Sequence, residues 1–223
     1  MAHLMKEETY MSCRMNNIFD EFAEEYDAWF DGHRWAYESE ILALRQIMLS
    51  GGIGLEIGVG TGRFAASLDI AVGIEPARRM GAIAKDRGID VVEACAEYLP
   101  FRNASFDFAL LVTTLCFVRD PLASLQEARR VIRPGGRLII GMIDSESPLG
   151  RTYESKRYKS KFYRNAVFLS IGQVVAWLEE LDFYDIRINQ TIFGKPDNMI
   201  KADPVKEGHG EGQFAGIRAT RGS

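Results

Sequence analysis

The segment that decides the fold is Leu55-Glu56-Ile57-Gly58-Val59-Gly60-Thr61-Gly62-Arg63-Phe64. A short apolar strand, predicted over 53–57, ends in this glycine-rich turn, and a helical pattern over 63–68 follows directly. Glycine has no Cβ, so the backbone of such a turn can approach a ligand closely. The backbone N–H groups at the start of the helix point toward the same place. We therefore expect a ligand site at this turn.

Strand and helix patterns alternate after the turn. The expected strands are 71–74, 90–92, 106–113, 137–143, 184–193 and 214–220, and the expected helices are 77–87, 122–132 and 172–181. Alternation at this spacing implies right-handed βαβ units. The sequence predicts a Rossmann-like, doubly wound α/β fold with a mostly parallel seven-stranded sheet and helices on both faces.

The chain is expected to form a single domain over 16–223. Its parts are a helical lid (16–50), a cofactor-binding core (51–143), a basic and aromatic insertion that covers the substrate (144–170), and a C-terminal helix with two strands (171–223). Residues 1–15 lack the apolar core of a signal peptide, so we expect a tag or a disordered segment there.

Two carboxylates accompany the turn. Glu56 precedes the glycines and could accept from an ammonium group, and Glu75 lies 17 positions after Gly58, where it could accept from both hydroxyls of a ribose. The dinucleotide fingerprint GxGxxG needs a third glycine for close helix–strand packing. Arg63 stands at that position, which makes a nicotinamide cofactor less favoured.

The turn instead fits the pattern Glu-x-Gly-x-Gly-x-Gly, and with three ordered downstream segments it resembles the class I S-adenosylmethionine-dependent methyltransferases. These segments are Glu75-Pro76, Ala94–Phe101 and Leu125–Gly136. Within this family, the motifs most resemble those of the methyltransferases of ubiquinone and menaquinone biosynthesis. The resemblance implies an enzyme that uses S-adenosylmethionine and releases S-adenosylhomocysteine. The cofactor-binding residues that it implies are Tyr26, Glu56, Gly58, Gly60, Thr61, Gly62, Glu75, Pro76, Met80, Cys95, Ala96, Glu97, Val112, Thr113 and Phe117.

The chain departs from the family pattern at Cys95, where the family usually has an aspartate that accepts from the adenine amino group. A thiol is a poor acceptor. We therefore expect adenine to be held by backbone groups near Ala96, by Glu97 and by apolar packing, and Cys95 to be a small core residue.

The methyl acceptor is expected to lie under the lid and the insertion. The family commonly begins with a Tyr-Asp pair on a lid helix, as Tyr26-Asp27 does here. We predict His33 as a general base. The predicted substrate contacts are Phe30, Tyr37, Tyr153, Phe162 and His209.

Composition limits the classes of function. Of the 223 residues, 47% are hydrophobic and 26% are charged, and the formal net charge is −4, as in ordinary globular proteins. This balance argues against wholesale binding to nucleic acids. Three scattered cysteines favour neither a disulfide framework nor a metal site, and no apolar run is long enough to span a membrane. We expect a cytoplasmic monomer or homodimer.

The leading hypothesis is transfer of a methyl group to a nitrogen, oxygen, sulfur or carbon atom of a small molecule by in-line displacement. One alternative is an RNA methyltransferase that uses the basic insertion at 151–164. A second is a regulator that binds S-adenosylmethionine without turnover.

Overall fold

One twisted sheet organises residues 18–48 and 51–223, the parts of the chain that the computed structural model describes. In these residues the sheet has eight strands in the order β3-β2-β1-β4-β5-β8-β6-β7. The strands are β1 (Gly54–Ile57), β2 (Val72–Ile74), β3 (Asp90–Val92), β4 (Phe106–Val112), β5 (Ile132–Ile143), β6 (Phe183–Thr191), β7 (Lys206–Glu207) and β8 (Phe214–Arg221).

The pairing of the strands confirms the predicted fold class. Strands β1 to β5 pair in parallel with one another, and β8 runs antiparallel between β5 and β6. The prediction of seven strands missed β7, a two-residue edge strand within the long connection from β6 to β8. The chain order reverses between β1 and β4, and such a reversal places a crevice at the carboxyl ends of the strands.

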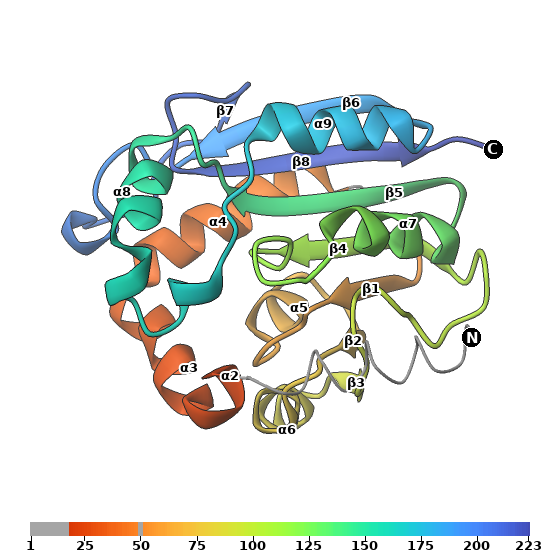
Figure 1. The fold of residues 1–223 in the computed structure, drawn as a ribbon, viewed down its shortest axis with the longest axis horizontal. Helices are drawn as coiled ribbons and strands as arrows, with labels where there is room; N and C mark the ends of the chain where they lie inside the picture. The colour runs from red at the N-terminus through yellow and green to blue at the C-terminus, as the bar shows by residue number, and fades with distance from the viewer. Residues whose placement is uncertain (1–17, 49–50) are drawn as a thin grey trace.

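Helices cover both faces of the sheet, as expected (Figure 1). They are α2 (Ile18–Glu21), α3 (Ala23–Gly32), α4 (Arg34–Ile47), α5 (Arg63–Ser67), α6 (Arg78–Asp86), α7 (Pro121–Val131), α8 (Pro148–Lys156) and α9 (Ile171–Glu180), with 3₁₀ turns η1 (Arg157–Lys159), η2 (Tyr163–Asn165) and η3 (Pro196–Asn198). Helices α7 and α9 lie in front of the sheet in Figure 1, and α4 and α5 lie behind it.

Polar caps fix the beginnings of three helices. The side chains of Asp120, Ser147 and Ser170 each accept a backbone N–H from the first turn of α7, α8 and α9, respectively. The insertion at 144–170 contains α8, in which Arg151 and Lys156 are exposed.

The two faces of the sheet have separate apolar cores. Leu125 of α7 and Leu178 of α9 are fully buried in the front core, and Leu44 of α4 is fully buried in the rear core. The front core needs no contribution from the N-terminal helices α2, α3 and α4.

At the carboxyl ends of the strands, α3, α8 and both 3₁₀ turns of the insertion gather on one side (Figure 1). The sequence prediction for residues 1–15 lies outside the described residues.

Arg63 joins α3 to the helix that follows the glycine turn. Its guanidinium donates to both carboxylate oxygens of Asp27, at 2.8 and 2.9 Å, and to Asp31 at 2.8 and 3.0 Å. Arg87 donates to Asp27 as well, at 2.8 Å. Forked contacts between arginine and carboxylate are the strongest ion pairs that side chains make, so Asp27 ties the N-terminal helices to the core.

Substitution Asp27→Asn is expected to lower the free energy of unfolding by about 2 kcal/mol, because two guanidinium groups lose a charged acceptor. Urea denaturation measures the change. Asp31→Asn is the matched control, since Asp31 pairs with the same arginine but its side chain is 71% exposed. We expect a clearly smaller effect from it, and equal losses would show that the Asp27 pairs contribute no more than the exposed Asp31 pair.

The contribution of Asp27 should disappear in acid. The hydrogen bonds from Arg63 and Arg87 lower the pKa of Asp27 below its usual value. A lowered folded-state pKa stabilises the protein above the unfolded pKa of about 3.9, and this contribution is lost as the pH falls further. The difference in stability between the wild type and Asp27→Asn should therefore be constant near pH 7 and shrink below about pH 4.

Candidate functional site

The glycine turn leaves β1 by a path that side chains would block. Gly58, Gly60 and Gly62 have φ angles of +76°, +54° and +81°, in the left-handed region that favours glycine. A Cβ at Gly58 would lie 2.5 Å from Thr114 Oγ1, so this position tolerates no side chain. At Gly60 the space is open until Tyr26, whose Cε1 would lie 4.0 Å from an added Cβ. The turn therefore presents bare backbone beneath Tyr26.

Glu75 follows β2 and lies against this turn. One carboxylate oxygen accepts the N–H of Gly60 and the other accepts the N–H of Ala77, both at 2.9 Å. Burial raises the pKa of Glu75 to about 7, although the two backbone N–H groups act in the opposite direction. Each oxygen has a second lone pair, so the carboxylate can still accept from two hydroxyl groups.

Glu56 is the buried acid of β1. Its side chain is almost completely enclosed, and the Oε2 atom has no hydrogen-bond partner in the described part of the chain. Burial raises the pKa of Glu56 well above its usual value, and a backbone N–H from Ala65 lowers it in part. An enclosed acceptor without a partner is costly. A cationic group bound beside the turn would supply that partner, as predicted for the ammonium group of a methionine moiety.

The segment after β3 differs in detail from the expectation for an adenine site. Cys95 and Ala96 are buried, as predicted for core residues. Cys95 is disulfide-bonded, however, although the scattered cysteines favoured no disulfide framework. The carboxylate of Glu97 accepts the N–H groups of Arg119 and Asp120, so it connects this segment to the loop after β4.

The end of β4 completes the wall of the site. Val112 is buried, and Thr113 has φ +48°, an unusual angle for a β-branched residue. Backbone strain of this kind collects at functional sites. Phe117 lies farther along the same loop, with its ring centroid 4.9 Å from that of Phe19. Of the other predicted cofactor residues, Met80 packs with Tyr26 in a small apolar cluster, Pro76 adjoins Glu75, and the hydroxyl of Thr61 donates to Asp27.

Tyr26 connects the turn with the rest of the site. Its hydroxyl hydrogen-bonds with Thr113, and burial raises its pKa. Its ring packs edge-on against Phe30 at 5.4 Å and against Phe162 at 5.6 Å between centroids. A residue of α3 therefore bridges the cofactor turn, the end of β4 and the insertion.

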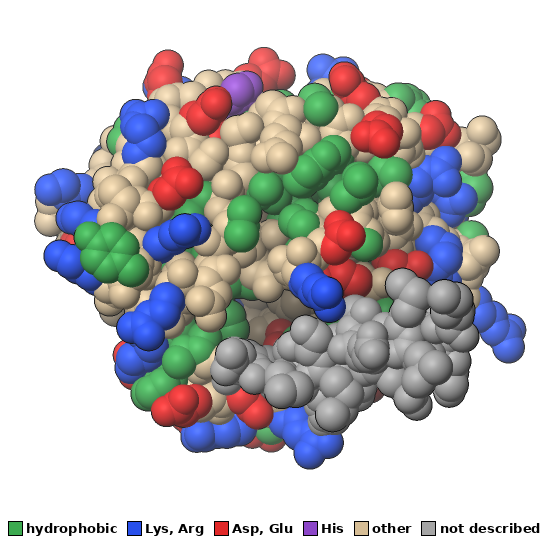
Figure 2. All heavy atoms as spheres, in the orientation of Figure 1, with side chains coloured by type: hydrophobic (Ala, Val, Ile, Leu, Met, Phe, Trp, Pro, Cys, Tyr) green, Lys and Arg blue, Asp and Glu red, His purple; other side chains and the backbone are tan. Residues whose placement is uncertain are grey.

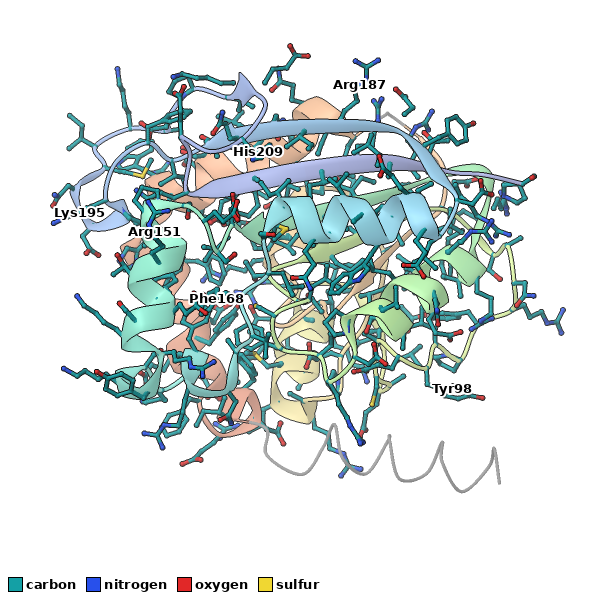
Figure 3. All side chains as sticks on the ribbon, turned by 45° about the horizontal axis from the view of Figure 1, so that its top comes forward. Tyr98, Arg151, Phe168, Arg187, Lys195 and His209 are labelled. Carbon is teal, nitrogen blue, oxygen red and sulfur yellow. The ribbon has the colours of Figure 1, made fainter. Side chains whose placement is uncertain are left out.

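Aromatic rings from the insertion continue this wall. Tyr163 stacks on Tyr153 at 4.9 Å and on Phe117 at 5.5 Å, and Phe168 lies 5.6 Å from Tyr163. Figure 3 shows Phe168 between the insertion and the strands. A cavity of about 20 Å³ borders Tyr163, Phe168 and Thr113, which is room for about one water molecule. We call Tyr26, Phe117, Tyr153, Phe162, Tyr163 and Phe168 the aromatic wall.

The structure places the remaining candidates around this wall in different ways. Phe30 is buried beside Tyr26, but the hydroxyl of Tyr37 is used within the core: it donates to the carbonyl of Arg63 and lies 2.7 Å from Ser67 Oγ. His33 Nδ1 contacts the carbonyl of Trp29 at 2.8 Å, and Nε2 contacts Asp197 at 2.9 Å. Both nitrogens are thus engaged, so the structure offers no proton-accepting atom at His33 toward the turn.

His209 is not part of the cluster. It is exposed in the loop between β7 and β8, and Figure 3 shows it on a peripheral loop apart from Phe168. The structure therefore brings together Tyr153 and Phe162 from the predicted substrate contacts, with Phe30 behind them, but not His209. The surface is hollowed beside the carboxyl end of β1 (Figure 2).

The sequence reasoning missed Glu40. This residue of α4 is buried, and burial raises its pKa to about 8. A signal was present: Glu40 occurs at helical spacing with Ala36, Ala43 and Ile47, which form the buried face of the helix. An acid in an apolar stripe is rarely buried without a functional or structural reason.

The described residues contain neither a candidate metal site nor a candidate membrane-spanning helix. No group of three or more histidine, cysteine, aspartate or glutamate side chains in 18–48 and 51–223 could hold a metal ion. In the same ranges, helices of sufficient length and apolarity to traverse a bilayer are absent.

The model of the methyltransferase domain family matches residues 55–140, from β1 to β5. An uncharacterized protein of Methanocaldococcus jannaschii is 49% identical over 92% of this chain and 99% of its own length. A demethylmenaquinone methyltransferase of Oceanobacillus iheyensis is 26% identical over 75% of this chain and 78% of its own.

A solved structure extends the match to nearly the whole fold. A protein of Thermotoga maritima, described as an S-adenosylmethionine-dependent methyltransferase and possible histamine N-methyltransferase, superposes with a TM-score of 0.89 at 48% identity. The match covers 92% of this chain and 98% of the other. With the glycine turn, the two buried acids and the strand order in place, the chain belongs to the class I S-adenosylmethionine-dependent methyltransferases.

Proposed function

We propose that this methyltransferase acts on a small-molecule acceptor held between the glycine turn and the aromatic wall. The observation that carries the proposal is Tyr26, which contacts both: it lies over Gly60 and packs against Phe162 of the insertion. The cavity at the aromatic wall measures about 20 Å³, so an acceptor has to displace side chains there, and a small molecule displaces fewer of them than a polymer does.

Different residues at and beside the turn would bind different parts of the methyl donor. S-adenosylmethionine supplies a sulfonium-bound methyl group that is electrophilic. Glu56 Oε2 has no partner, which suits the ammonium group, and Glu75 keeps two acceptor positions, which suits the ribose hydroxyls. At Gly60 only Tyr26 comes within 4.0 Å of an added Cβ, which leaves room for the ligand to lie against the turn.

The N-terminal helices and the insertion would align the acceptor and exclude water. Methyl transfer disperses positive charge, so the site needs orientation more than a strong electrostatic clamp. The aromatic wall offers apolar surface for this purpose. The basic side chains of the insertion do not face the aromatic wall. Lys156, Arg157 and Lys159 are exposed. The rings of Tyr153, Phe162 and Tyr163 are partly buried. These three rings offer little stacking surface for bases, although Tyr158 of η1 is 64% exposed beside Lys159.

The relatives suggest two kinds of acceptor. One relative is named for demethylmenaquinone and another for histamine, so phenolic quinone precursors and amines are both reasonable classes to test. The decisive experiment incubates the protein with isotopically labelled S-adenosylmethionine and a panel of amines, thiols, phenols and quinone precursors, and reads methylated products by mass. Tight S-adenosylhomocysteine binding with no product from any class would favour the regulator without turnover. We also predict a cytoplasmic location and a monomeric or dimeric state.

S-adenosylhomocysteine should raise the melting temperature of the protein, and NAD should leave it unchanged. The reason is that Arg63 occupies the position where a dinucleotide site needs glycine, while ligand binding to the folded state alone stabilises it. Differential scanning fluorimetry with each ligand at equal concentration measures this. Stabilisation by NAD alone would contradict the assignment of the ligand.

Substitution Glu75→Gln should weaken S-adenosylhomocysteine binding about tenfold or more, because a hydrogen bond to a charged acceptor contributes about 1.5–3 kcal/mol. Isothermal titration calorimetry gives the affinity. Asp90→Asn is the matched control: it removes an acid from the exposed start of β3 and should leave the affinity unchanged. Equal affinities for Glu75→Gln and the wild type would remove Glu75 from the site.

The same binding should depend on pH near neutrality. Burial raises the pKa of Glu75 to about 7, so its ionised fraction increases as the pH rises from 6 to 8. The ionised carboxylate accepts hydrogen bonds at both oxygens, whereas the protonated form loses part of this capacity. Affinity for S-adenosylhomocysteine should therefore increase across this range in the wild type and change less in Glu75→Gln.

A further inference from the structure

A cleft lies at the edge of the sheet opposite the glycine turn. Its volume is about 520 Å³, and it is lined by residues at the ends of α7, α9 and β8 and in the turn before β6. Figure 1 shows these ends on the right, whereas α3 and α8 lie on the left. The parallel strands thus separate this cleft from the methyl-donor site. Its volume is in the range of sites that bind small molecules.

Arg221 is the cation of this cleft that lacks an acidic partner. One of its terminal nitrogens, Nη1, donates to the carbonyl of Ile132. Its Nε is enclosed and has no partner in the described part of the chain. Among residues 18–48 and 51–223, no carboxylate forms an ion pair with Arg221. A guanidinium has five N–H donors, so most of those on Arg221 are not used by the described residues.

Arg129 brings a second guanidinium into the same cleft. Its Nη2 donates to Asp182 Oδ2 and to the main-chain oxygen of Ser223, both at 3.0 Å, and its Nε is enclosed without a partner among the described residues. Asp182 also adjoins the end of β8, because its carbonyl accepts the N–H of Gly222 at 2.8 Å. Burial and the positive charge of Arg129 lower the pKa of Arg221, as expected for two cations held close together. An anion between them would offset this repulsion.

The other charges of the cleft define what an anion would meet there. Arg130 lines the cleft as well, but it donates to both oxygens of Glu127, at 2.7 and 2.8 Å. Of the two lining acids, one already pairs with Arg129, and the other is Glu180 at the exposed end of α9. Arg221 is therefore the main attraction for an anion, and Glu180 is the main repulsion.

An adjoining cleft offers apolar surface. It measures about 510 Å³, is lined by Tyr98, Pro100 and Phe101 among others, and shares Arg130 with the first cleft. The side of Tyr98 that faces solvent is substantial, since the residue is 42% exposed, and Figure 3 shows it pointing outward, apart from Phe168. Apolar surface beside two guanidinium groups suits a molecule in which an organic part carries an anionic group.

The pair of guanidinium groups favours a phosphoryl group over a carboxylate. A carboxylate has two oxygens, which a single guanidinium can satisfy. A phosphate monoester has three terminal oxygens and nearly two negative charges at neutral pH, so it can bridge two arginines.

We infer that this cleft is a second binding site, which holds the phosphoryl group of a small phosphorylated molecule between Arg129 and Arg221. The organic part of that molecule lies toward Tyr98. Because the strands separate this site from the glycine turn, it can be occupied while S-adenosylhomocysteine is bound.

The test measures binding to the full chain saturated with S-adenosylhomocysteine, so that the probes do not report on the donor site. Calorimetry at constant ionic strength compares inorganic phosphate, phenyl phosphate and benzoate. We expect phenyl phosphate to bind more tightly than phosphate, and benzoate to bind at least tenfold more weakly than phenyl phosphate. Equal affinities for the two phosphates would overturn the organic ligand in favour of free phosphate. Equal affinities for phenyl phosphate and benzoate would overturn the phosphoryl site.

Variants assign the binding to the cleft. Arg221→Gln should reduce the affinity for phenyl phosphate about tenfold or more, and Arg221→Lys should reduce it less, because lysine keeps the charge but loses the fork. Arg133→Gln is the matched control: it removes the same charge at the same edge of the sheet, from an arginine that pairs with Asp107 outside the cleft. It should leave the affinity unchanged. Glu180→Gln should increase the affinity, because it removes the repelling acid.

Two results would overturn the inference. One is the absence of phenyl phosphate binding to the wild type at millimolar concentration. The other is an equal loss of affinity in Arg221→Gln and Arg133→Gln, which would show attraction by overall charge instead of by a site. Thermal unfolding checks that each variant is folded, and Arg221→Lys with Glu180→Gln carries the test if Arg221→Gln is not.

Discussion

The left-handed backbone at Gly58, Gly60 and Gly62 is the constraint on which the site depends. It lets the chain leave β1, bend back and bring the Gly60 N–H to within 2.9 Å of the Glu75 carboxylate. This contact connects the first two strands of the sheet at their carboxyl ends. A side chain at Gly58 would strike Thr114, so the bend also sets the position of the loop after β4. The floor of the donor site follows from one local conformational requirement.

Ion pairs then hold helix α3 over the glycine turn. Arg63 begins the helix after the turn and donates to two acids of α3. Arg87, at the end of α6, reaches the same Asp27 and the carbonyl of Thr61. The turn, α3 and α6 are thus held by one set of charges, and Tyr26 lies over Gly60 as a result. The residue that argues against a dinucleotide site is therefore also the residue that attaches the N-terminal helices.

Three buried acids give the site its chemical character. Burial raises the pKa of Glu40, Glu56 and Glu75 alike, but their hydrogen bonding differs. Glu75 accepts from two backbone N–H groups, Glu56 keeps one oxygen without a partner, and Glu40 has none for either oxygen among the described residues. These differences suit the proposed ribose hydroxyls at Glu75 and the proposed ammonium group at Glu56.

Short-range patterns determined the elements of the fold. Apolar runs, helical periodicity and glycine or proline boundaries placed the seven principal strands and most helices within a few residues, because each such signal arises from neighbours along the chain. The glycine turn was predicted for the same reason. The bounds of α8 were not predicted, because its charged and aromatic residues carry little periodicity.

Only the tertiary structure decided which side chains meet. Tyr26 and Phe162 lie 136 positions apart in the sequence and yet pack at 5.6 Å. Asp197 occupies one nitrogen of His33, Arg63 and Ser67 contact the hydroxyl of Tyr37, and the loop after β4 engages Glu97. No local pattern encodes such contacts, because they depend on how helices pack on the sheet. Glu40 shows the same division: its place on the buried face of a helix was present in the sequence, whereas the lack of a partner among the described residues arises from packing between distant segments.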